Sequence, residues 1–352
     1  MRKVIVYFLA LLILWSVVPV ATVQASSVGR RANSAQSRNK VSWETAMNRS
    51  LDWIYESVSP NPVVGSVGGE WAVLALARAE RVNANDPWVR AWLADLDRTL
   101  VEVNRLARTN DIHNPPSVGT FPSALRRWTD FQRVTIALSA LGIDASDHNG
   151  RDLTEVFNSH VPVARRHALN QTVNVDTFAL IALDTNAYSG DRDRFIRSLL
   201  REQRANGTWS LNPSAPSSAM DLDVTAMALQ ALAPYFYRND ARVTEAVNNA
   251  LGWLRSQTFP DAESTAQMIV ALTALGPDFA DEARYYVNHL LTWFDPASGG
   301  FIRSAQNNQV NHMSTEQAAY ALVAYWRFVN NMTHLYDMSD VFDDAGTASS
   351  GR

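Results

Sequence analysis

The sequence predicts an all-α protein, an (α/α)6 toroid of six outer–inner helix pairs around a central cavity. Three observations predict it. Apolar segments that contain an Ala-Leu pair recur six times, amphipathic segments alternate with them, and no segment shows the two-residue apolar alternation of a β-strand. Successive Ala-Leu pairs are 40 to 62 residues apart, which suits one helical hairpin per repeat.

The amphipathic segments predict the outer helices. In each of them, apolar residues recur at i, i+3, i+4 and i+7, and charged residues occupy the other face. A helix of this kind buries one stripe and leaves the rest in water. In chain order, these segments are residues 43–58, 87–104, 152–161, 193–203, 241–257 and 282–294.

The Ala-Leu segments predict the inner helices, because they are apolar nearly all round and must be covered on both sides. In chain order, they are residues 71–79, 133–142, 178–184, 226–234, 267–277 and 318–326. An open solenoid would need terminal repeats with a polar outer face. Neither end of this array has such a face, so we expect the array to close into a ring. The segment 334–342 is expected to pack across the barrel.

The sequence predicts that both ends of the chain lie outside the folded domain. A basic start at Arg2 and Lys3, an apolar run at 4–18 and the small residues of 23–25 predict a cleaved signal peptide. The run is shorter than the roughly 20 residues that span a bilayer, so we expect no membrane span after cleavage. The predicted organisation is a signal peptide at 1–25, a flexible linker at 26–40, the toroid domain at 41–342 and a disordered tail at 343–352.

Composition narrows the function. The chain has no cysteine, and its formal net charge is −4. We therefore expect an exported bacterial protein, secreted or at the cell surface, that neither contains disulfides nor binds nucleic acid by bulk attraction. The histidines show no metal-ligand spacing, and there is no glycine-rich phosphate loop. No metal and no resident cofactor are expected.

An acidic residue stands at or near the start of every predicted inner helix. Since the inner helices of a closed ring all begin at the same end, these acids should surround one mouth of the cavity. They are Glu70, Asp130, Asp176, Asp223, Glu263 and Glu316. One interpretation is that each only stabilises its helix N-terminus, by about 0.3–1 kcal/mol. The other is that crowded carboxyl groups raise one pKa and recognise a ligand, with help from Trp71 and from Arg126 in the loop 105–128.

Three phrases carry a family resemblance. "LLREQRANGTW" (199–209) resembles the QW repeat of squalene cyclases, in which a glutamine that ends an outer helix is followed by Gly-x-Trp. "DLDVTAMALQALAPYF" (221–236) and "STEQAAYALVAYWRF" (314–328) resemble segments of secreted single-toroid proteins. Over residues 41–342 the chain resembles the terpene-cyclase and protein-prenyltransferase toroid superfamily. It is most similar to secreted single-toroid proteins of Gram-positive bacteria that carry prenyltransferase/squalene-oxidase repeats.

The resemblance implies specific site residues. Class II terpene cyclases protonate an alkene with an Asp-x-Asp-Asp-Thr-Ala box, whose first and central acids match Asp221 and Asp223. Val224 stands in the place of the last acid. Asp223, assisted by Asp221, is therefore the catalytic candidate. The zinc chemistry of the prenyltransferases needs a cysteine that this chain lacks. The same toroid occurs in cobalamin carriers, which makes a corrinoid a candidate ligand.

These observations favour a binding protein over an enzyme. Its ligand would be a small apolar or corrinoid-like molecule at the acid-ringed mouth, or a cell-surface partner protein. Two enzymes remain as alternatives. One is a terpene or squalene cyclase-like enzyme with Asp223 as proton donor. The other is a glycoside-processing (α/α)6 enzyme that uses Asp223 and Glu263 as its two carboxyl groups, under a lid formed by residues 105–128.

Overall fold

The computed structural model describes residues 41–342, except 61, 66, 108–124, 126, 159–172, 212–220 and 239. The described residues belong to one compact unit, Val41–Arg352. The predicted signal peptide, linker and tail lie outside the described residues, as do Arg126 and most of the predicted lid.

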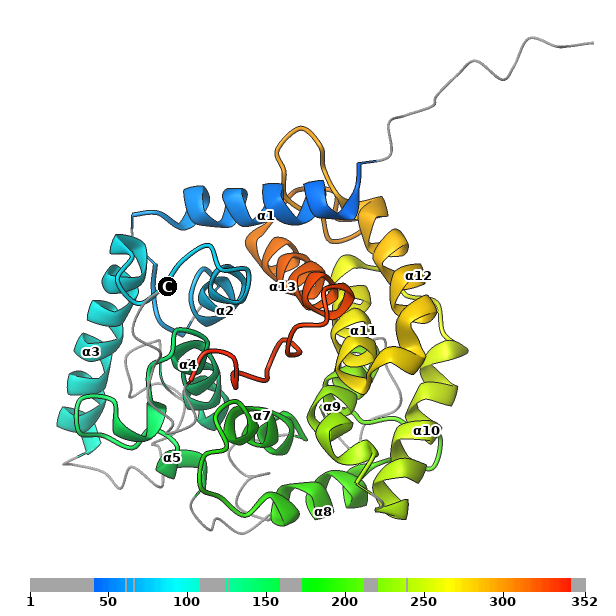
Figure 1. Ribbon diagram of the computed structural model, residues 1–352, viewed down its shortest axis with the longest axis horizontal. Coiled ribbons are helices and arrows are strands. Elements are labelled where there is room, and N and C mark those ends of the chain that lie inside the picture. Colours follow the sequence, from blue (N-terminus) through cyan, green and yellow to red (C-terminus); the bar gives the residue numbers. More distant parts are fainter. Residues whose placement is uncertain are drawn as a thin grey trace, which may run out of the picture. The chain divides into compact units, whose positions relative to one another are not determined.

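Helices alternate between an outer and an inner position in this unit, as Figure 1 shows. The outer helices are α1 (Trp43–Val58), α3 (Pro87–Ala107), α5 (Glu155–Asn158), α8 (Arg192–Glu202), α10 (Ala241–Arg255) and α12 (Ala280–Leu290). The inner helices are α2 (Glu70–Arg78), α4 (Trp128–Ala140), α7 (Val173–Asp184), α9 (Asp221–Phe236), α11 (Ala262–Leu275) and α13 (His312–Val329). The predicted (α/α)6 toroid is confirmed.

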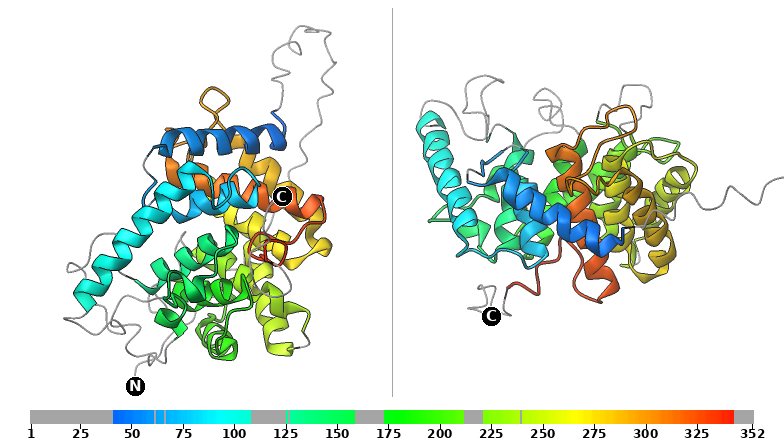
Figure 2. Two further views of the ribbon diagram at one scale, coloured as in Figure 1. Left: turned by 60° about the vertical axis from the view of Figure 1, so that its left-hand side comes forward. Right: turned by 90° about the horizontal axis from the view of Figure 1, so that it is seen from above.

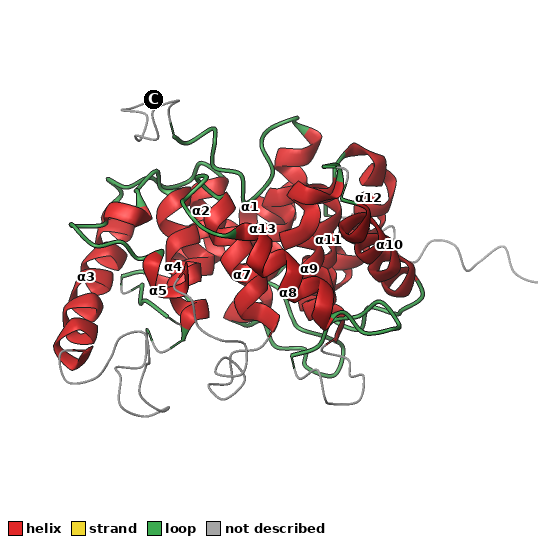
Figure 3. Cartoon of the chain, turned by 90° about the horizontal axis from the view of Figure 1, so that it is seen from below, coloured by secondary structure: helices red, strands yellow, loops and turns green. Residues whose placement is uncertain are grey.

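Helices and loops make up the described part of the chain, as Figure 3 shows. Its short 3-10 helices are η1 (Ala145–Asp147), η2 (Pro277–Phe279) and η3 (Leu291–Trp293). The β pairing within it consists of isolated bridges, Phe294 with Phe301 and Ile302 with Val310. No described helix is long and apolar enough to cross a membrane.

One helix begins later than its pattern predicts. The segment 152–161 was expected to be helical from its first residue, but α5 begins at Glu155. The reason is that the Asp152 carboxylate accepts hydrogen bonds from the backbone N–H groups of Thr154 (2.8 Å) and Glu155 (3.2 Å). A side chain that accepts from these positions acts as the cap that precedes a helix.

The Ala-Leu pairs form the wall between the two rings of helices. All twelve residues of the six pairs are at most 1% exposed. Each inner helix packs against the next one in the ring, and α13 packs against α2. The small alanine side chains let neighbouring helices approach, and the leucines fill the space between them.

The ring closes between the last repeat and the first. Helix α1 lies beside α13 (Figure 1 and Figure 2). The guanidinium group of Arg49 on α1 donates to the carbonyl oxygens of Pro296 and Ala297, in the turn between α12 and α13. In the same turn Gly299 has φ +91°, and an added Cβ would lie 3.1 Å from the Arg49 carbonyl oxygen. The expected closure is therefore made by direct contacts between repeats six and one.

The QW-like phrase joins three helices. The Gln203 side chain, just after α8, donates to the carbonyl oxygens of Gly207 (3.0 Å) and of Ala246 on α10 (2.8 Å). The buried indole of Trp209 donates to the Leu199 carbonyl oxygen (2.8 Å). The Trp209 backbone N–H donates to the Thr225 hydroxyl of α9 (3.0 Å). This motif fixes α8, α9 and α10 relative to one another.

Residues 333–342 form a crossing segment, which spans the ring at the mouth where the inner helices end. This segment is the red trace in the middle of Figure 1. Two arginines that are each 1% exposed, Arg78 on α2 and Arg327 on α13, hold it in place. Both form ion pairs with Asp340, and both donate to the Thr333 hydroxyl. Arg78 also donates to the backbone oxygens of His334 (3.2 Å) and Asp337 (2.9 Å). The expectation that 334–342 packs across the barrel is confirmed.

The Asp340 carboxylate is the counter-charge of both Arg78 and Arg327. Burial alone would raise its pKa, but the charges of Arg78 and Arg327 override that effect and lower the pKa. Burial beside Arg327 also lowers the pKa of Arg78, to about 10. The carboxylate therefore compensates two buried guanidinium groups at once.

The variant Asp340→Asn is expected to destabilise the fold by about 3 kcal/mol, because it leaves two buried arginine charges uncompensated. Urea denaturation followed by circular dichroism measures this loss. Asp281→Asn is the matched control, since the Asp281 side chain is 92% exposed in its ion pair with Arg284. The expectation is wrong if both variants unfold at the same urea concentration.

The variant Gly207→Ala is expected to lower the free energy of unfolding by at least about 2 kcal/mol. Backbone strain and steric overlap both contribute to this loss. Gly207 has φ +88°, and an added Cβ would lie 2.6 Å from the backbone oxygen of Asn249 on α10. Gly252→Ala on the same helix is the control: a Cβ there meets nothing within 4 Å, and alanine stabilises helices by up to about 1 kcal/mol over glycine. Gly207→Ala should lower the thermal midpoint of unfolding, and Gly252→Ala should raise it. Equal decreases in both variants would exclude this explanation.

Candidate functional site

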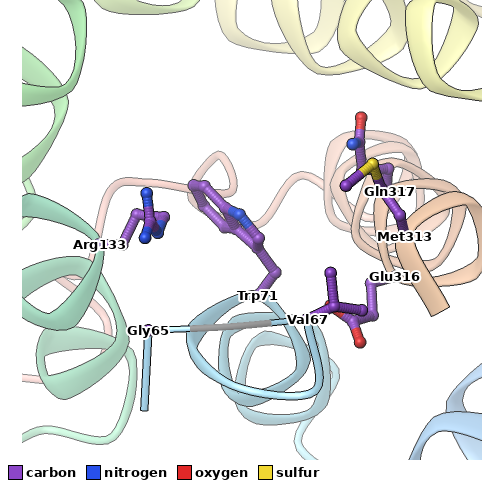
Figure 4. Close-up of a pocket in the computed structure, with 7 residues that line it drawn as sticks. All are labelled: Gly65, Val67, Trp71, Arg133, Met313, Glu316 and Gln317. Carbon is purple, nitrogen blue, oxygen red and sulfur yellow. The ribbon is translucent and has the colours of Figure 1, made fainter. Parts of the chain in front are cut away.

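A cavity of about 280 Å³ opens at the mouth where the inner helices begin. Its lining comes from α2, α4 and α13 and from the loop before α2. Figure 4 shows the Trp71 ring between Arg133 of α4 and Gln317 of α13. The ring centroids of Phe178 and Tyr320 each lie 5.7 Å from that of Trp71, so an aromatic cluster continues from the cavity into the ring.

Three of the six predicted acids link neighbouring repeats. The Glu263 carboxylate accepts from the Ser314 hydroxyl of α13 (2.8 Å). The Glu316 carboxylate accepts from the Gly68 backbone N–H before α2 (2.7 Å). The Glu70 carboxylate accepts from the Gly65 N–H (2.6 Å) and lies 3.8 Å from the Arg133 guanidinium of α4. These acids therefore do more than cap their own helices, because they join one helix start to the next.

Arg133 is the cation in the lining of this cavity. Its guanidinium group lies 2.6 Å from the Asp130 carboxylate and also faces Glu70. Asp130 accepts from the Arg127 backbone N–H as well (2.8 Å), at the start of α4. Arg126, the cation expected from the sequence, lies outside the described residues, and Arg133 was not among the expected site residues. The available signal was its position three residues after Asp130, one helical turn away.

Burial perturbs the pKa of two acids at this mouth. It raises the pKa of Glu70 to about 7, although the Arg133 charge opposes the rise. It also raises the pKa of Glu316, although the hydrogen bond from the Gly68 N–H and the nearby His312 ring, whose Nδ1 lies 3.6 Å away, oppose the rise. The remaining predicted acid, Asp176, is 3% exposed in the first turn of α7.

Asp223 differs from the other acids. Burial raises its pKa to about 7, the Asp261 and Glu263 charges add to the rise, and Arg303 opposes it. Within the described part of the chain, its carboxyl group has no hydrogen bond. Asp221, two residues earlier, is fully buried in an ion pair with Arg204 at 3.1 Å. Asp223 therefore has a raised pKa, and no described neighbour donates a hydrogen bond to its carboxyl group. Asp221, the other residue that matches the cyclase box, is held in an ion pair by Arg204.

The surroundings of Asp223 come from the next repeat. The Arg303 guanidinium, half exposed, lies 3.1 Å from the Glu263 carboxylate and 3.9 Å from that of Asp261. Asp261 caps α11 by accepting from the Ser264 backbone N–H (2.9 Å). An acid that is half protonated at neutral pH therefore stands beside an ion-paired carboxylate. Pairs of carboxyl groups in unlike environments are typical of acid–base chemistry.

A chain of polar side chains crosses the inside of the ring. The Gln230 amide donates to the Gln267 side-chain oxygen (2.9 Å). The Gln267 amide donates to the Gln317 side-chain oxygen (2.8 Å) and to the Tyr320 hydroxyl. Burial raises the pKa of Tyr320 well above its usual range, with contributions from the Tyr336, Asp223 and Glu316 groups. Asp223 and Glu316 thus lie near the same phenol, which connects the acid of α9 with the cavity.

A metal is not suggested by these residues. Within the described residues, no group of three or more histidine, aspartate or glutamate side chains is arranged to hold a metal ion. The chemistry that the arrangement offers is proton transfer from a carboxylic acid, beside a second carboxylate and an aromatic surface.

Comparison with known proteins adds one similar fold. No protein-family model matches the sequence, and no curated protein matches it. Among solved structures, the chain is similar to an unsaturated glucuronyl hydrolase from Streptococcus agalactiae, with 12% identity and a TM-score of 0.48. The match covers 84% of this chain and 93% of that one. Membership of the terpene-cyclase superfamily stays a prediction.

One expectation from the sequence is corrected by this comparison. We expected a binding protein rather than an enzyme, and a terpene-cyclase-like one if it was an enzyme. The similar chain is a hydrolase, which runs against the first of these expectations, a binding protein. At this identity the likeness concerns the fold alone, and it identifies neither a reaction nor a residue. The reaction must therefore be argued from the side chains.

The variant Asp223→Asn is expected to change how stability depends on pH. The folded-state pKa is about 7, above the unfolded value of about 3.9. The folded state therefore binds more protons between these values, and its stabilisation is lost as pH rises through about 7. Between pH 5 and pH 8 the parent should lose about 2 kcal/mol more than Asp223→Asn.

Urea titrations at both pH values measure this difference. Asp193→Asn is the control, because the Asp193 side chain is 81% exposed on α8. It should follow the parent at both pH values. Parallel pH dependence in the parent and in Asp223→Asn would contradict the raised pKa.

Proposed function

We propose that the protein is a hydrolase of glycoside-type substrates that works by acid–base catalysis at the mouth where the inner helices begin. The observation that supports this most directly is the pairing of Asp223, whose pKa is raised to about 7, with the ion-paired Glu263 of the adjacent inner helix. Glycosidic bond cleavage uses two carboxyl groups of this kind, one protonated and one ionised.

Each residue has a distinct role in this proposal. Asp223 donates its proton to the leaving-group oxygen as the glycosidic bond breaks. Glu263 acts as the carboxylate that either activates water or attacks the sugar carbon. Arg303 forms an ion pair with Glu263, and the Ser314 hydroxyl orients the Glu263 carboxylate. The Trp71 ring offers an aromatic face on which a sugar can stack.

The polar interior favours this substrate class. The hydrogen-bonded glutamines 230, 267 and 317 and the Tyr320 hydroxyl lie on the inner helices. They match the hydroxyl groups of a sugar better than a hydrocarbon chain, because an apolar substrate would leave their remaining hydrogen-bonding capacity unused.

A second candidate is a terpene-cyclase-like reaction in which Asp223 protonates an alkene. The aromatic cluster of Trp71, Phe178 and Tyr320 supports it, because aromatic faces stabilise carbocations. Against it stands Val224, an apolar core residue that is 2% exposed in the place of the last acid of the box.

The proposal also includes export directed by residues 1–25 and an extracytoplasmic location. It includes catalysis without a cofactor as well.

The test is hydrolysis of a panel of 4-nitrophenyl α- and β-glycosides, including glycosiduronic acids, by the full chain. Asp223→Asn and Glu263→Gln should each lower kcat at least about 100-fold, the usual contribution of a positioned acid or base. Gln at 263 can retain the hydrogen bond from Ser314. In the parent, kcat should fall as pH rises above about 7, because Asp223 then loses the proton that it must donate.

The control is Asp193→Asn, which should retain parental activity with every substrate that the parent cleaves. Undiminished hydrolysis by Asp223→Asn, or no cleavage of any glycoside, would refute the proposal. Conversion of squalene into a cyclic product that depends on Asp223 would establish the second candidate instead.

A further inference from the structure

A second cavity, of about 450 Å³, lies at the opposite mouth of the ring. Its wall combines the ends of α7 and α9 with the segment that crosses the ring, which contributes His334, Tyr336 and Asp337. Its volume falls within the range of small-molecule sites, and it is distinct from the cavity at Trp71. The residues of the proposed catalytic pair do not line it.

Two buried polar atoms of this wall have no partner within the described structure. Gln230 is 3% exposed; its amide group donates to Gln267, whereas its side-chain oxygen accepts no hydrogen bond. The Nδ1 atom of His334 also has no partner. Burial lowers the pKa of His334, which favours the neutral form of the ring. An unsatisfied buried polar group costs about 1–3 kcal/mol, which a ligand that bonds to it would recover.

The charged groups of the wall differ in how they are engaged. Arg192 is fully used, because it donates to Asp184 (2.6 Å) and to the backbone oxygens of Leu183 (2.6 Å) and Tyr188 (2.9 Å). The exposed Arg238 guanidinium stacks over the Tyr235 ring at 5.0 Å and has no carboxylate partner within the described residues. Arg238 is therefore the cation that can meet an anion from solution.

The acids of the wall already have hydrogen-bond donors. Asp184 accepts from the Tyr235 hydroxyl (2.7 Å) and pairs with Arg192. Asp337 accepts from the Ser339 backbone N–H (3.0 Å). The unused hydrogen-bonding capacity of this cavity thus includes the Gln230 amide oxygen, the His334 Nδ1 atom and the Arg238 guanidinium group. The Tyr336 hydroxyl lies in the same wall.

We propose that this cavity binds a small, monosaccharide-sized molecule that carries several hydroxyl groups and one anionic group, either a carboxylate or a phosphate. Hydroxyl groups of the ligand donate to the Gln230 oxygen and bond to His334 Nδ1, while its anionic group pairs with Arg238. The inference is independent of catalysis at the other mouth. Since His334 belongs to the crossing segment, the ligand would hold that segment against α7 and α9.

Isothermal titration calorimetry on the full chain tests the proposal with two probes, D-gluconate for the carboxylate and D-glucose 6-phosphate for the phosphate. At least one of them should bind saturably and raise the thermal midpoint, and the tighter one identifies the anion. D-Sorbitol, which lacks the anionic group, should bind at least tenfold more weakly. Ligand should also slow hydrogen exchange in residues 333–342.

Variants locate the site. Arg238→Gln, at an exposed position, should weaken binding of the anionic probe at least tenfold, whereas Arg284→Gln, at an exposed position on α12, should leave it unchanged. Asp223→Asn should also leave it unchanged, which separates this site from the proposed catalytic mouth. The proposal is overturned if neither anionic probe binds saturably, if Arg238→Gln binds as the parent does, or if Asp223→Asn abolishes binding.

Discussion

Closure of the helical ring brings the starts of all the inner helices to one mouth, and this constraint governs the site. Helix N-termini attract carboxylates, but six carboxylates around one opening would repel one another if each faced only its own helix. The structure resolves the conflict through links between repeats: Glu263 to Ser314, Glu316 to Gly68, and Glu70 to Arg133. The same acids therefore stabilise the helix starts and hold the ring shut. Asp223 is the acid that these links leave with a raised pKa and no hydrogen bond from a described neighbour.

At the opposite mouth the inner helices end, and their exposed carbonyl oxygens favour cations. Arg78 and Arg327 supply these cations at the ends of α2 and α13, and Asp340 balances their charges. One mouth is thus covered by the chain's own crossing segment, and the other keeps a cavity beside ionisable groups. The first cavity and its ionisable groups therefore lie at the mouth where the helices begin, and the crossing segment forms a wall of the second cavity.

The fold was predictable because it depends on local patterns. Amphipathic and all-apolar segments alternate in the sequence, and burial of every Ala-Leu pair follows from that alternation. The site was only partly predictable. Its carboxyl groups were visible as helix starts, but the difference between Asp221 and Asp223 depends on which neighbours each one meets. Asp223 faces groups that lie about 40 residues later in the chain, so the comparison with a cyclase box within one segment could not reveal its pKa. Buried arginines such as Arg78 were hidden too, because they sit inside segments that read as apolar.

Gln230 shows how the two mouths are connected. Its amide nitrogen donates to Gln267, which in turn donates to Gln317 at the first cavity, while its oxygen borders the second cavity without a partner. The direction of donation along this chain fixes which end of the Gln230 amide remains for a ligand. Reversing the amide would place its oxygen against the Gln267 oxygen and cost a buried hydrogen bond. The ligand proposed for the second cavity would therefore donate to the Gln230 oxygen. That bond would fix the glutamine chain that also reaches the first cavity. This contact supplies a physical route between the mouths, and energetic coupling along it requires that the chain also have a second stable arrangement.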